Sequence, residues 1–233
     1  MRDINPASVL DAGCAFGFLV EKLRQQGVEA WGLDISEYAI QNVHPTMQPY
    51  CWVGSIIDPL PRRYDLIIVV EVVEHLEKPD GEQAVANICR FSDDILFSST
   101  PLDYQTVTHV NVQPPEYWAQ LFGRHGFFRD VDFDASFITP WATRFRRRSD
   151  PPHRLVADYE RRFWLLWKEN VDMRQQLANM DAQLKADEGA IQSLHSRIDD
   201  LRRQLSYFEN NPAWKILNAL RARLRGLGGR RSS

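Results

Sequence analysis

The sequence predicts an α/β fold: a Rossmann-like, mostly parallel seven-stranded sheet with helices on both faces, followed by a long C-terminal coiled-coil helix. Two observations predict it. From Ser8 to about Phe145, short apolar runs alternate with helical stretches, as in a parallel sheet with helical crossovers. From Val156 to Phe208, seam residues recur at alternating steps of three and four. The 233 residues are enough for one α/β domain and an appendage.

The expected strands of the parallel part are short and bounded by turn residues, and they cover residues 8–11, 29–34, 51–54, 65–70 and 94–99. Helices are predicted between them at 18–26 and 81–91, and after the last of them at 115–125. Two more apolar runs, 127–133 and 137–143, follow with only a short break. We expect these two runs to form an antiparallel hairpin at one edge of the sheet.

Four regions follow from the changes in pattern. Residues 1–148 form the α/β domain, and residues 149–154 form a linker, because Pro151 and Pro152 interrupt both helix and sheet. The run from Arg144 to Arg148 ends the domain as a basic segment that either contacts a phosphate or leads into the linker. Residues 155–210 form the coiled coil, and residues 211–233 form a basic amphipathic tail.

The coiled-coil pattern is polar only at Asn170 and Asp187. Ile191 and Ile198 occupy one seam position and the leucines three residues later occupy the other, which favours a parallel two-stranded coil in which a buried Asn170 fixes the register. The sequence therefore predicts a homodimer through a parallel coiled coil. The alternative is a long helix that folds back on its own α/β domain.

The tail carries cations on one side and apolar residues on the other. No acid follows Glu209, whereas the cations there are Lys215, Arg221, Arg223, Arg225, Arg230 and Arg231. The apolar face is Trp214, Leu217, Leu220, Leu224 and Leu227. This pattern predicts an interfacial helix on an anionic membrane surface. Packing on a protein partner, or fraying in solvent, is the alternative.

Composition narrows the function classes. The net charge of −3 provides no general attraction to nucleic acid, so no nucleic-acid partner is expected. The three cysteines have no CxxC spacing, which indicates reduced thiols. No apolar run is long enough to span a bilayer, and no signal peptide precedes the first strand. A cytoplasmic protein is expected, with any membrane contact peripheral at the inner membrane face.

A nucleotide-binding motif occupies the first strand, its turn and the second strand. Gly13 and Gly17 permit a left-handed turn and a close ligand approach, and Asp34 ends the next strand, where it can accept both hydroxyl groups of a ribose. Ala15 stands where a dinucleotide fingerprint has its middle glycine. This argues against NAD or FAD, whose pyrophosphate needs the closest approach to the backbone.

These residues resemble the first motif of class I S-adenosylmethionine-dependent methyltransferases, and the stretch from Tyr64 to Leu76 resembles that family's fourth strand and glutamate-histidine signature. The resemblance implies S-adenosylmethionine as cofactor. It implies that Asp11, Gly13, Cys14, Ala15 and Gly17 surround its methionine part, that Asp34 holds the ribose and that Ile35 lies against the adenine. It also implies that Ser55 and Ile56 reach the edge of the adenine and that Glu71 binds the cofactor.

Glu71, Glu74 and His75 are spaced to share one side of a helical turn. With His109 after the fifth strand, the set resembles the metal site of small-RNA 2′-O-methyltransferases, and its first three members match ubiquinone-pathway O-methyltransferases. Both groups methylate one hydroxyl of a vicinal pair. This resemblance implies Mg²⁺ or Mn²⁺ bound by Glu71, Glu74, His75 and His109. The alternatives are catalysis by His75 as a metal-free base, with Glu71 beside it, and purely structural roles.

The long rod and basic tail also resemble those of bacterial envelope-polysaccharide methyltransferases. The leading hypothesis is therefore O-methylation of a sugar hydroxyl on a bacterial surface glycan or its lipid-linked precursor. O-methylation of a small molecule or quinone is one alternative. Another is an inactive scaffold or length ruler that has the methyltransferase fold and dimerises through the coiled coil.

Overall fold

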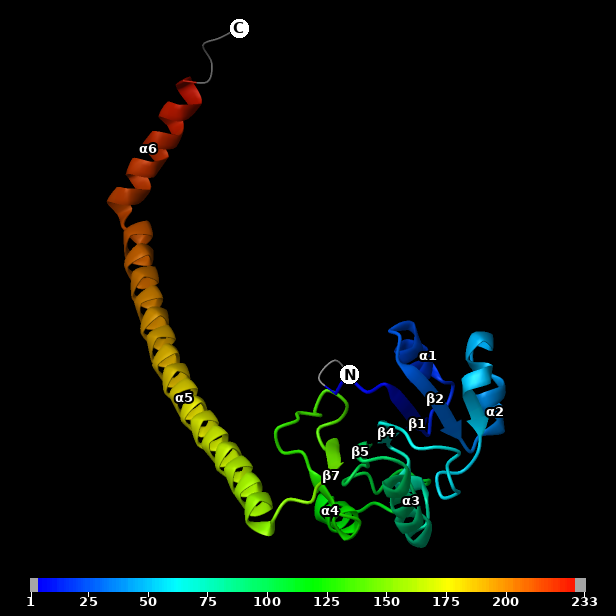
Figure 1. The fold of residues 1–233 in the computed structure, drawn as a ribbon. Coiled ribbons are helices and arrows are strands. Elements are labelled where there is room, and N and C mark those ends of the chain that lie inside the picture. The colour runs from blue at the N-terminus through cyan, green and yellow to red at the C-terminus, as the bar shows by residue number, and fades with distance from the viewer. Residues whose placement is uncertain (1–3, 229–233) are drawn as a thin grey trace. The chain divides into compact units, whose positions relative to one another are not determined.

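The structure is a computed structural model that describes residues 4–228, with side chains described to residue 222. The chain divides into two compact units, Met1–Phe163 and Trp164–Ser233. The first unit contains the α/β fold and the second contains most of the long helix (Figure 1).

The first unit is built on a seven-stranded sheet, as predicted. Its strand order is β3-β2-β1-β4-β5-β7-β6, and β7 alone runs in the direction opposite to the other strands. The buried strands are continuous apolar runs because helices cover both faces. The strands are β1 Ser8–Ala12, β2 Glu29–Asp34, β3 Cys51–Val53, β4 Leu66–Val70, β5 Asp94–Ser98, β6 Phe127–Arg129 and β7 Thr143–Arg147.

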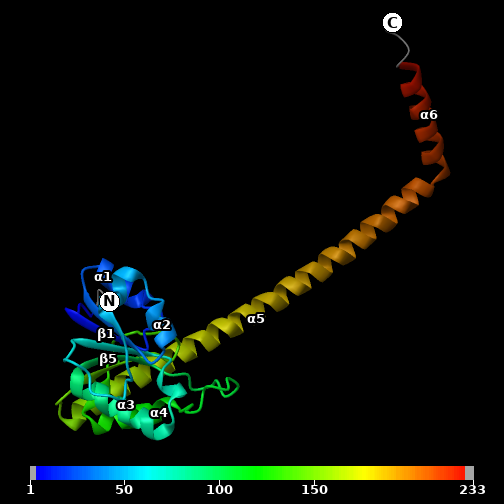
Figure 2. The same ribbon diagram turned by 90° about the vertical axis from the view of Figure 1, so that its right-hand side faces the viewer.

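Helices connect the parallel strands and cover both faces of the sheet, so the core has two layers that the sheet separates (Figure 2). Val20 and Leu23 of α1 pack on one face of the sheet, and the buried residues of α3 and α4 pack on the other. This arrangement leaves the carboxyl ends of the strands free to carry a site. The helices are α1 Phe18–Gln25, α2 Glu37–Gln41, α3 Lys78–Phe91 and α4 Pro115–Arg124, with 3₁₀ helices at Pro45–Tyr50 and Val73–His75.

The edge hairpin differs from the prediction. Its first strand, β6, covers only the beginning of the predicted run 127–133. Its second strand is β7, which begins where the predicted run 137–143 ends. The core selects this later segment because it buries Phe145 in a stack on Phe122, with ring centroids 4.1 Å apart. On the other side of β7, Arg144 pairs with Asp94 and Asp130. Most of the basic run is therefore a paired strand and not part of a linker.

The second unit is helical. Helix α5, Pro152–Asn210, begins in the first unit and continues without a break through the second, so the long C-terminal helix is present. Pro212 lacks the N–H that would continue the hydrogen-bonding ladder, and α6, Pro212–Gly228, begins there. Within residues 4–228, no helix combines the length and the apolar content that a membrane span requires.

The predicted tail face is only partly visible. Trp214 and Leu217 are exposed on α6, as are Leu220 and Arg221. The rest of the predicted tail pattern lies outside the described side chains, namely Arg223, Leu224, Arg225, Leu227, Arg230 and Arg231.

Candidate functional site

The turn after β1 is tightly fitted against the neighbouring strands. Gly13 has a φ of +92°, and its N–H and that of Cys14 both donate to the carbonyl oxygen of Leu33, at 2.7 and 3.1 Å. A Cβ on Gly13 would lie 2.3 Å from Cγ2 of Val72. This position therefore requires glycine for two reasons, its backbone conformation and the closeness of Val72.

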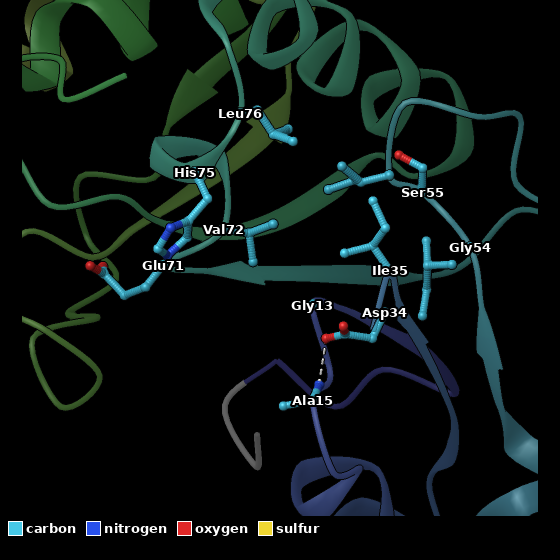
Figure 3. Close-up of a pocket in the computed structure, with 12 residues that line it drawn as sticks. Gly13, Ala15, Asp34, Ile35, Gly54, Ser55, Glu71, Val72, His75 and Leu76 are labelled. Carbon is cyan, nitrogen blue, oxygen red and sulfur yellow. Dashed lines mark hydrogen bonds between the residues drawn. The ribbon is translucent and has the colours of Figure 1, made fainter. Parts of the chain in front are cut away.

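Asp34 at the end of β2 is held by the same turn. Its carboxylate accepts a hydrogen bond from the N–H of Ala15, at 2.8 Å (Figure 3). It accepts a second from the N–H of Ser36, also at 2.8 Å. Ala15 has a φ of 45°, which an alanine adopts only at a cost, and its bond to Asp34 helps to offset that cost. Two donors thus orient the Asp34 carboxylate at the rim of a cavity.

That cavity measures about 430 Å³ and opens at the carboxyl ends of the central strands (Figure 3). Ile35 is 74% exposed, so it offers a flat apolar surface there. Among the residues predicted to bind the cofactor or to act in catalysis, the lining contains Gly13, Ala15, Asp34, Ile35, Ser55, Ile56, Glu71 and His75.

Three residues predicted at the cofactor lie behind the cavity wall. The Cys14 side chain packs against Gly32, where a Cβ would come within 2.6 Å of its sulfur. Gly17 lies next to the sulfur of Cys51, and Asp11 is buried at the end of β1. These residues shape the turn rather than line the cavity.

Asp11 makes the stability of the fold depend on pH. Burial raises its pKa to about 7, and the nearby charge of Asp34 adds to the rise. The folded state thus holds a proton that the unfolded chain releases near pH 4, so Asp11 makes stability fall as pH rises from about 4 to about 7, by roughly 1.4 kcal/mol per unit. Above pH 7 its penalty is constant.

Asp11→Asn removes this titration. We expect the variant to gain stability relative to the native protein at pH 8 but not at pH 4, as measured by urea unfolding at both values. The comparison is between the two proteins at each pH, which cancels the contributions of other titrating groups. An equal difference at both pH values would contradict the assignment of the pH dependence to Asp11.

Glu71, at the carboxyl end of β4, is an anchor. Its Oε1 accepts hydrogen bonds from Trp141 Nε1, at 2.9 Å, and from the hydroxyl of Ser98. Ser98 also bonds to Thr139, at 3.0 Å, so one carboxylate ties β4 to β5 and to the loop before β7. In Figure 3 the Glu71 carboxylate points away from Asp34, and its φ is 53°. Its side chain therefore fixes this end of the sheet.

Glu74, His75 and His109 come together in one cluster, with potential ligand atoms within 4.8 Å of one another. The two imidazole centroids are 4.7 Å apart. Glu71, predicted as a fourth ligand, is not part of this set. Burial is the main reason why the pKa of Glu74 rises to about 7, and the neighbouring Glu71 adds to this rise.

Glu74 is fully buried, and within residues 4–228 neither of its carboxylate oxygens meets a donor in hydrogen-bond geometry. The nearby hydroxyl of Ser99 is also buried without a partner there. An ionised carboxylate in such a place is costly unless a proton or a cation compensates for its charge. The donor set therefore fits a divalent cation.

In both histidines Nδ1 contacts a neighbouring oxygen, which leaves Nε2 as the nitrogen that can bind a ligand. His75 Nδ1 lies 3.1 Å from the carbonyl oxygen of Thr108. His109 Nδ1 lies 3.3 Å from the carbonyl oxygen of Asp103 and 3.4 Å from its carboxylate. Because these partners are acceptors, Nδ1 carries the proton and the lone pair is on Nε2. Such contacts typically orient metal-ligating histidines.

Sequence reasoning missed Trp141, Ser98, Thr139 and Asp103. Trp141 and Thr139 occupy a segment predicted as strand, and Ser98 lies within β5, where a small polar residue has no distinctive pattern. Asp103 follows the fifth strand in a loop whose contacts to His109 depend on the fold. The available signal was an unexplained tryptophan close to a predicted sheet edge.

Comparisons with known proteins find methyltransferases. Residues 2–129, more than half of the chain, match the family model described as "Methyltransferase domain". The chain is similar to the ubiquinone biosynthesis O-methyltransferase of Photorhabdus laumondii, with 29% identity over 35% of this chain and 36% of the relative. It is also similar to the protein of that name from Coxiella burnetii, with 27% identity over 58% of this chain and 60% of the relative. The chain thus matches between about a third and three fifths of their lengths.

Among solved structures, the fold is similar to that of magnesium protoporphyrin IX methyltransferase from Synechocystis PCC 6803 with bound SAH. The TM-score is 0.53 and the identity 19%, over 63% of this chain and 77% of the other. At this identity, the likeness concerns the fold alone.

Proposed function

The chain belongs to the methyltransferase domain family, and from that premise we propose that it transfers a methyl group from S-adenosylmethionine to one hydroxyl of a vicinal pair. The observation that carries the proposal is that His75 belongs to two features at once. It lines the same cavity as Asp34, and it is a member of the Glu74–His75–His109 cluster. A donor in the cavity and an acceptor at the cluster would therefore be neighbours.

The donor side uses residues that are already oriented. Asp34 keeps its carboxylate fixed through Ala15 and Ser36, and its remaining lone pairs accept the ribose hydroxyls. Ile35 and Ile56 provide apolar contact for the adenine, and Ser55 is a polar residue of the same lining. Methyl transfer is a direct displacement, so holding donor and acceptor in line is the protein's main contribution.

On the acceptor side, Glu74, His75 and His109 would hold Mg²⁺ or Mn²⁺, with Nε2 of each imidazole as the ligand atom. Such a cation, when bound, lowers the pKa of a hydroxyl that it coordinates. Glu74 would supply negative charge to the cation and would gain the partner that it lacks within the described part of the chain. In the absence of a cation, its pKa of about 7 keeps a proton on this buried carboxyl through much of the neutral range.

The acceptor we propose is an aromatic diol. The loop that carries His109 exposes four large apolar side chains, Leu102, Tyr104, Val107 and Val110, with exposed fractions from 52% to 94%. An apolar loop beside the cluster suits an aromatic ring better than a sugar. The names of the matched relatives place their O-methylation in ubiquinone biosynthesis, which also favours a quinol-type acceptor over the glycan of the leading sequence-based hypothesis.

The test is release of S-adenosylhomocysteine from S-adenosylmethionine by the full chain, with 3,4-dihydroxybenzoate or methyl mannoside as acceptor. We expect release with the catechol, supported by Mg²⁺ or Mn²⁺ and suppressed by EDTA. Release with the sugar alone would restore the glycan hypothesis. A folded protein that does not bind S-adenosylhomocysteine would overturn the enzymatic proposal and leave the scaffold.

A matched pair of variants tests the cation site. Glu74→Gln keeps the shape of the side chain but removes its charge, and we expect Mn²⁺ affinity to fall by at least tenfold while S-adenosylhomocysteine affinity is unchanged. Glu77→Gln alters an exposed carboxylate three residues further on and should leave both affinities unchanged. Equal Mn²⁺ binding by the two variants would contradict the role of Glu74.

A further inference from the structure

We propose that the second unit pairs with a second copy of this chain as an antiparallel two-stranded coiled coil, in a register set by Asn170 and Asp187. The starting observation is an apolar stripe on α5 whose side chains are 48% to 65% exposed. We define the seam as this stripe together with the two polar residues that interrupt it, Asn170 and Asp187. The apolar members are Leu166, Met173, Leu177, Met180, Leu184 and Ile191.

The seam is long, regular and without a partner in the described part of the chain. It runs for about 38 Å at 1.5 Å per residue, and α5 continues through it unbroken. Steps of three and four alternate without interruption, which is the spacing of a seam between two helices rather than of a helix on a sheet. A surface of this kind gains its stability by pairing.

The two polar residues decide the direction of pairing. In a parallel pair, each seam residue faces its own copy, so the two Asp187 carboxylates would be brought together away from water. Like charges in such a place repel, and desolvation adds to the cost. A parallel pair, which the neighbouring isoleucines and leucines favour by themselves, therefore has a costly layer at Asp187.

Reversing one helix removes this conflict. Reversal keeps each step of three opposite a step of three but exchanges its two ends, so each residue that begins a three-residue step faces one that ends it. With the two-fold axis between Ala178 and Asn179, Asn170 lies opposite Asp187 of the second copy. The same register places Leu166 opposite Ile191, Met173 opposite Leu184 and Leu177 opposite Met180. Every layer from Leu166 to Ile191 then pairs apolar with apolar or polar with polar.

The chemistry of the polar layer is complementary. The Asn170 amide can donate an N–H, and the Asp187 carboxylate accepts it in a charge-assisted bond. Asp187 already accepts from Gln183 through Oδ1, at 2.8 Å, so Oδ2 is available. On the flank of the seam, Arg174 lies across from Asp181 of the second copy, which adds an opposite-charge pair.

Other registers and other partners fit less well. A shift of one heptad places Asn170 against Met180 or Leu194 and leaves both polar groups facing apolar ones, which costs free energy for each unpaired group. The matching of the layers from Leu166 to Ile191 about one two-fold axis is a property of a self-complementary interface. A second copy of the chain is therefore the partner that the seam fits.

Cysteine cross-linking distinguishes the directions. The native cysteines Cys14, Cys51 and Cys89 are buried, so Leu166→Cys and Ile191→Cys can be made singly in the full chain. We expect a disulfide-linked dimer when the two purified variants are mixed, and none when either is oxidised alone. Self-linking of either variant alone would show a parallel pair, and a monomeric mass for the native chain by light scattering would exclude any dimer. Either result overturns the proposal.

A charge test needs no cross-link. Asn170→Lys places an ammonium opposite Asp187 in the antiparallel pair, so the dimer should be at least as tight as the native one. Asn170→Asp places carboxylates opposite each other, and we expect the dimer to be at least tenfold weaker. Sedimentation equilibrium measures both constants. If Asn170→Lys weakens the dimer as much as Asn170→Asp does, the polar pairing is wrong.

Discussion

A Gly13→Ala substitution is expected to abolish S-adenosylhomocysteine binding and to destabilise the first unit by several kcal/mol. The new Cβ would lie 2.3 Å from Cγ2 of Val72, a contact that requires the turn or the segment after β4 to move. The turn cannot move freely, because Gly13 N and Cys14 N are bonded to Leu33 and Ala15 N is bonded to Asp34. Any movement therefore displaces the carboxylate proposed to hold the ribose.

Gly27→Ala is the matched control. Gly27 also has a positive φ, +82°, but an added Cβ would meet nothing within 4 Å. Its cost should be the backbone strain alone, about 1 kcal/mol, with S-adenosylhomocysteine affinity retained. Thermal unfolding and calorimetric titration of both variants separate strain from steric conflict. If the two variants lose the same stability and the same affinity, the closeness of Val72 is not what demands glycine at position 13.

The order of elements was predictable because local patterns determine it. Each central strand is a short apolar run bounded by turn residues, and each crossover helix has one apolar face, so their positions follow from residues near one another in sequence. The exception is β7, which forms mostly within the basic run at the end of the domain and not in the apolar run 137–143. The stack of Phe145 on Phe122 and the pairing of Arg144 with Asp94 stabilise this segment as the strand, and both are contacts between residues far apart in the sequence.

The positions of the candidate site residues in the fold were predictable for the same reason, whereas the directions of their side chains depend on contacts between distant parts of the chain. Asp34 is the last residue of β2, and His75 lies in the short 3₁₀ helix that comes after β4, so placing the strand ends places these residues at the cavity. The sequence does not reveal where the side chains of Cys14 and Glu71 point. Cys14 turns toward Gly32, which has no side chain to oppose it, and Glu71 turns toward Trp141, which lies 70 residues away in the chain.

Replacing His75 by alanine is expected to lower turnover of a catechol acceptor by about two to four orders of magnitude, the usual contribution of a positioned acid or base. Binding of S-adenosylhomocysteine should change little, because Asp34 and the glycine turn remain in place. This loss is expected whether His75 binds a cation or removes a proton by itself. The variant therefore establishes that the residue matters without revealing how.

His109→Ala separates the two roles. If the cluster binds a cation, His109 is one of three ligands, and its loss should lower Mn²⁺ affinity and turnover together while donor affinity is retained. If His75 acts alone, turnover should fall only a fewfold, because His109 then serves as a neighbouring ring held by Asp103. His125→Ala, at the end of α4, is the control and should leave Mn²⁺ affinity and turnover unchanged.

Asp103→Asn extends this test to the group that orients His109. Asparagine cannot provide the carboxylate now 3.4 Å from His109 Nδ1, although the backbone carbonyl at 3.3 Å remains. A metal ligand that loses part of its support typically binds 10- to 100-fold more weakly, so Mn²⁺ affinity should fall toward the lower end of that range. Excess Mn²⁺ should then restore turnover in Asp103→Asn but not in His109→Ala. Rescue of neither variant, with Mn²⁺ binding intact in both, would leave His75 as a metal-free base.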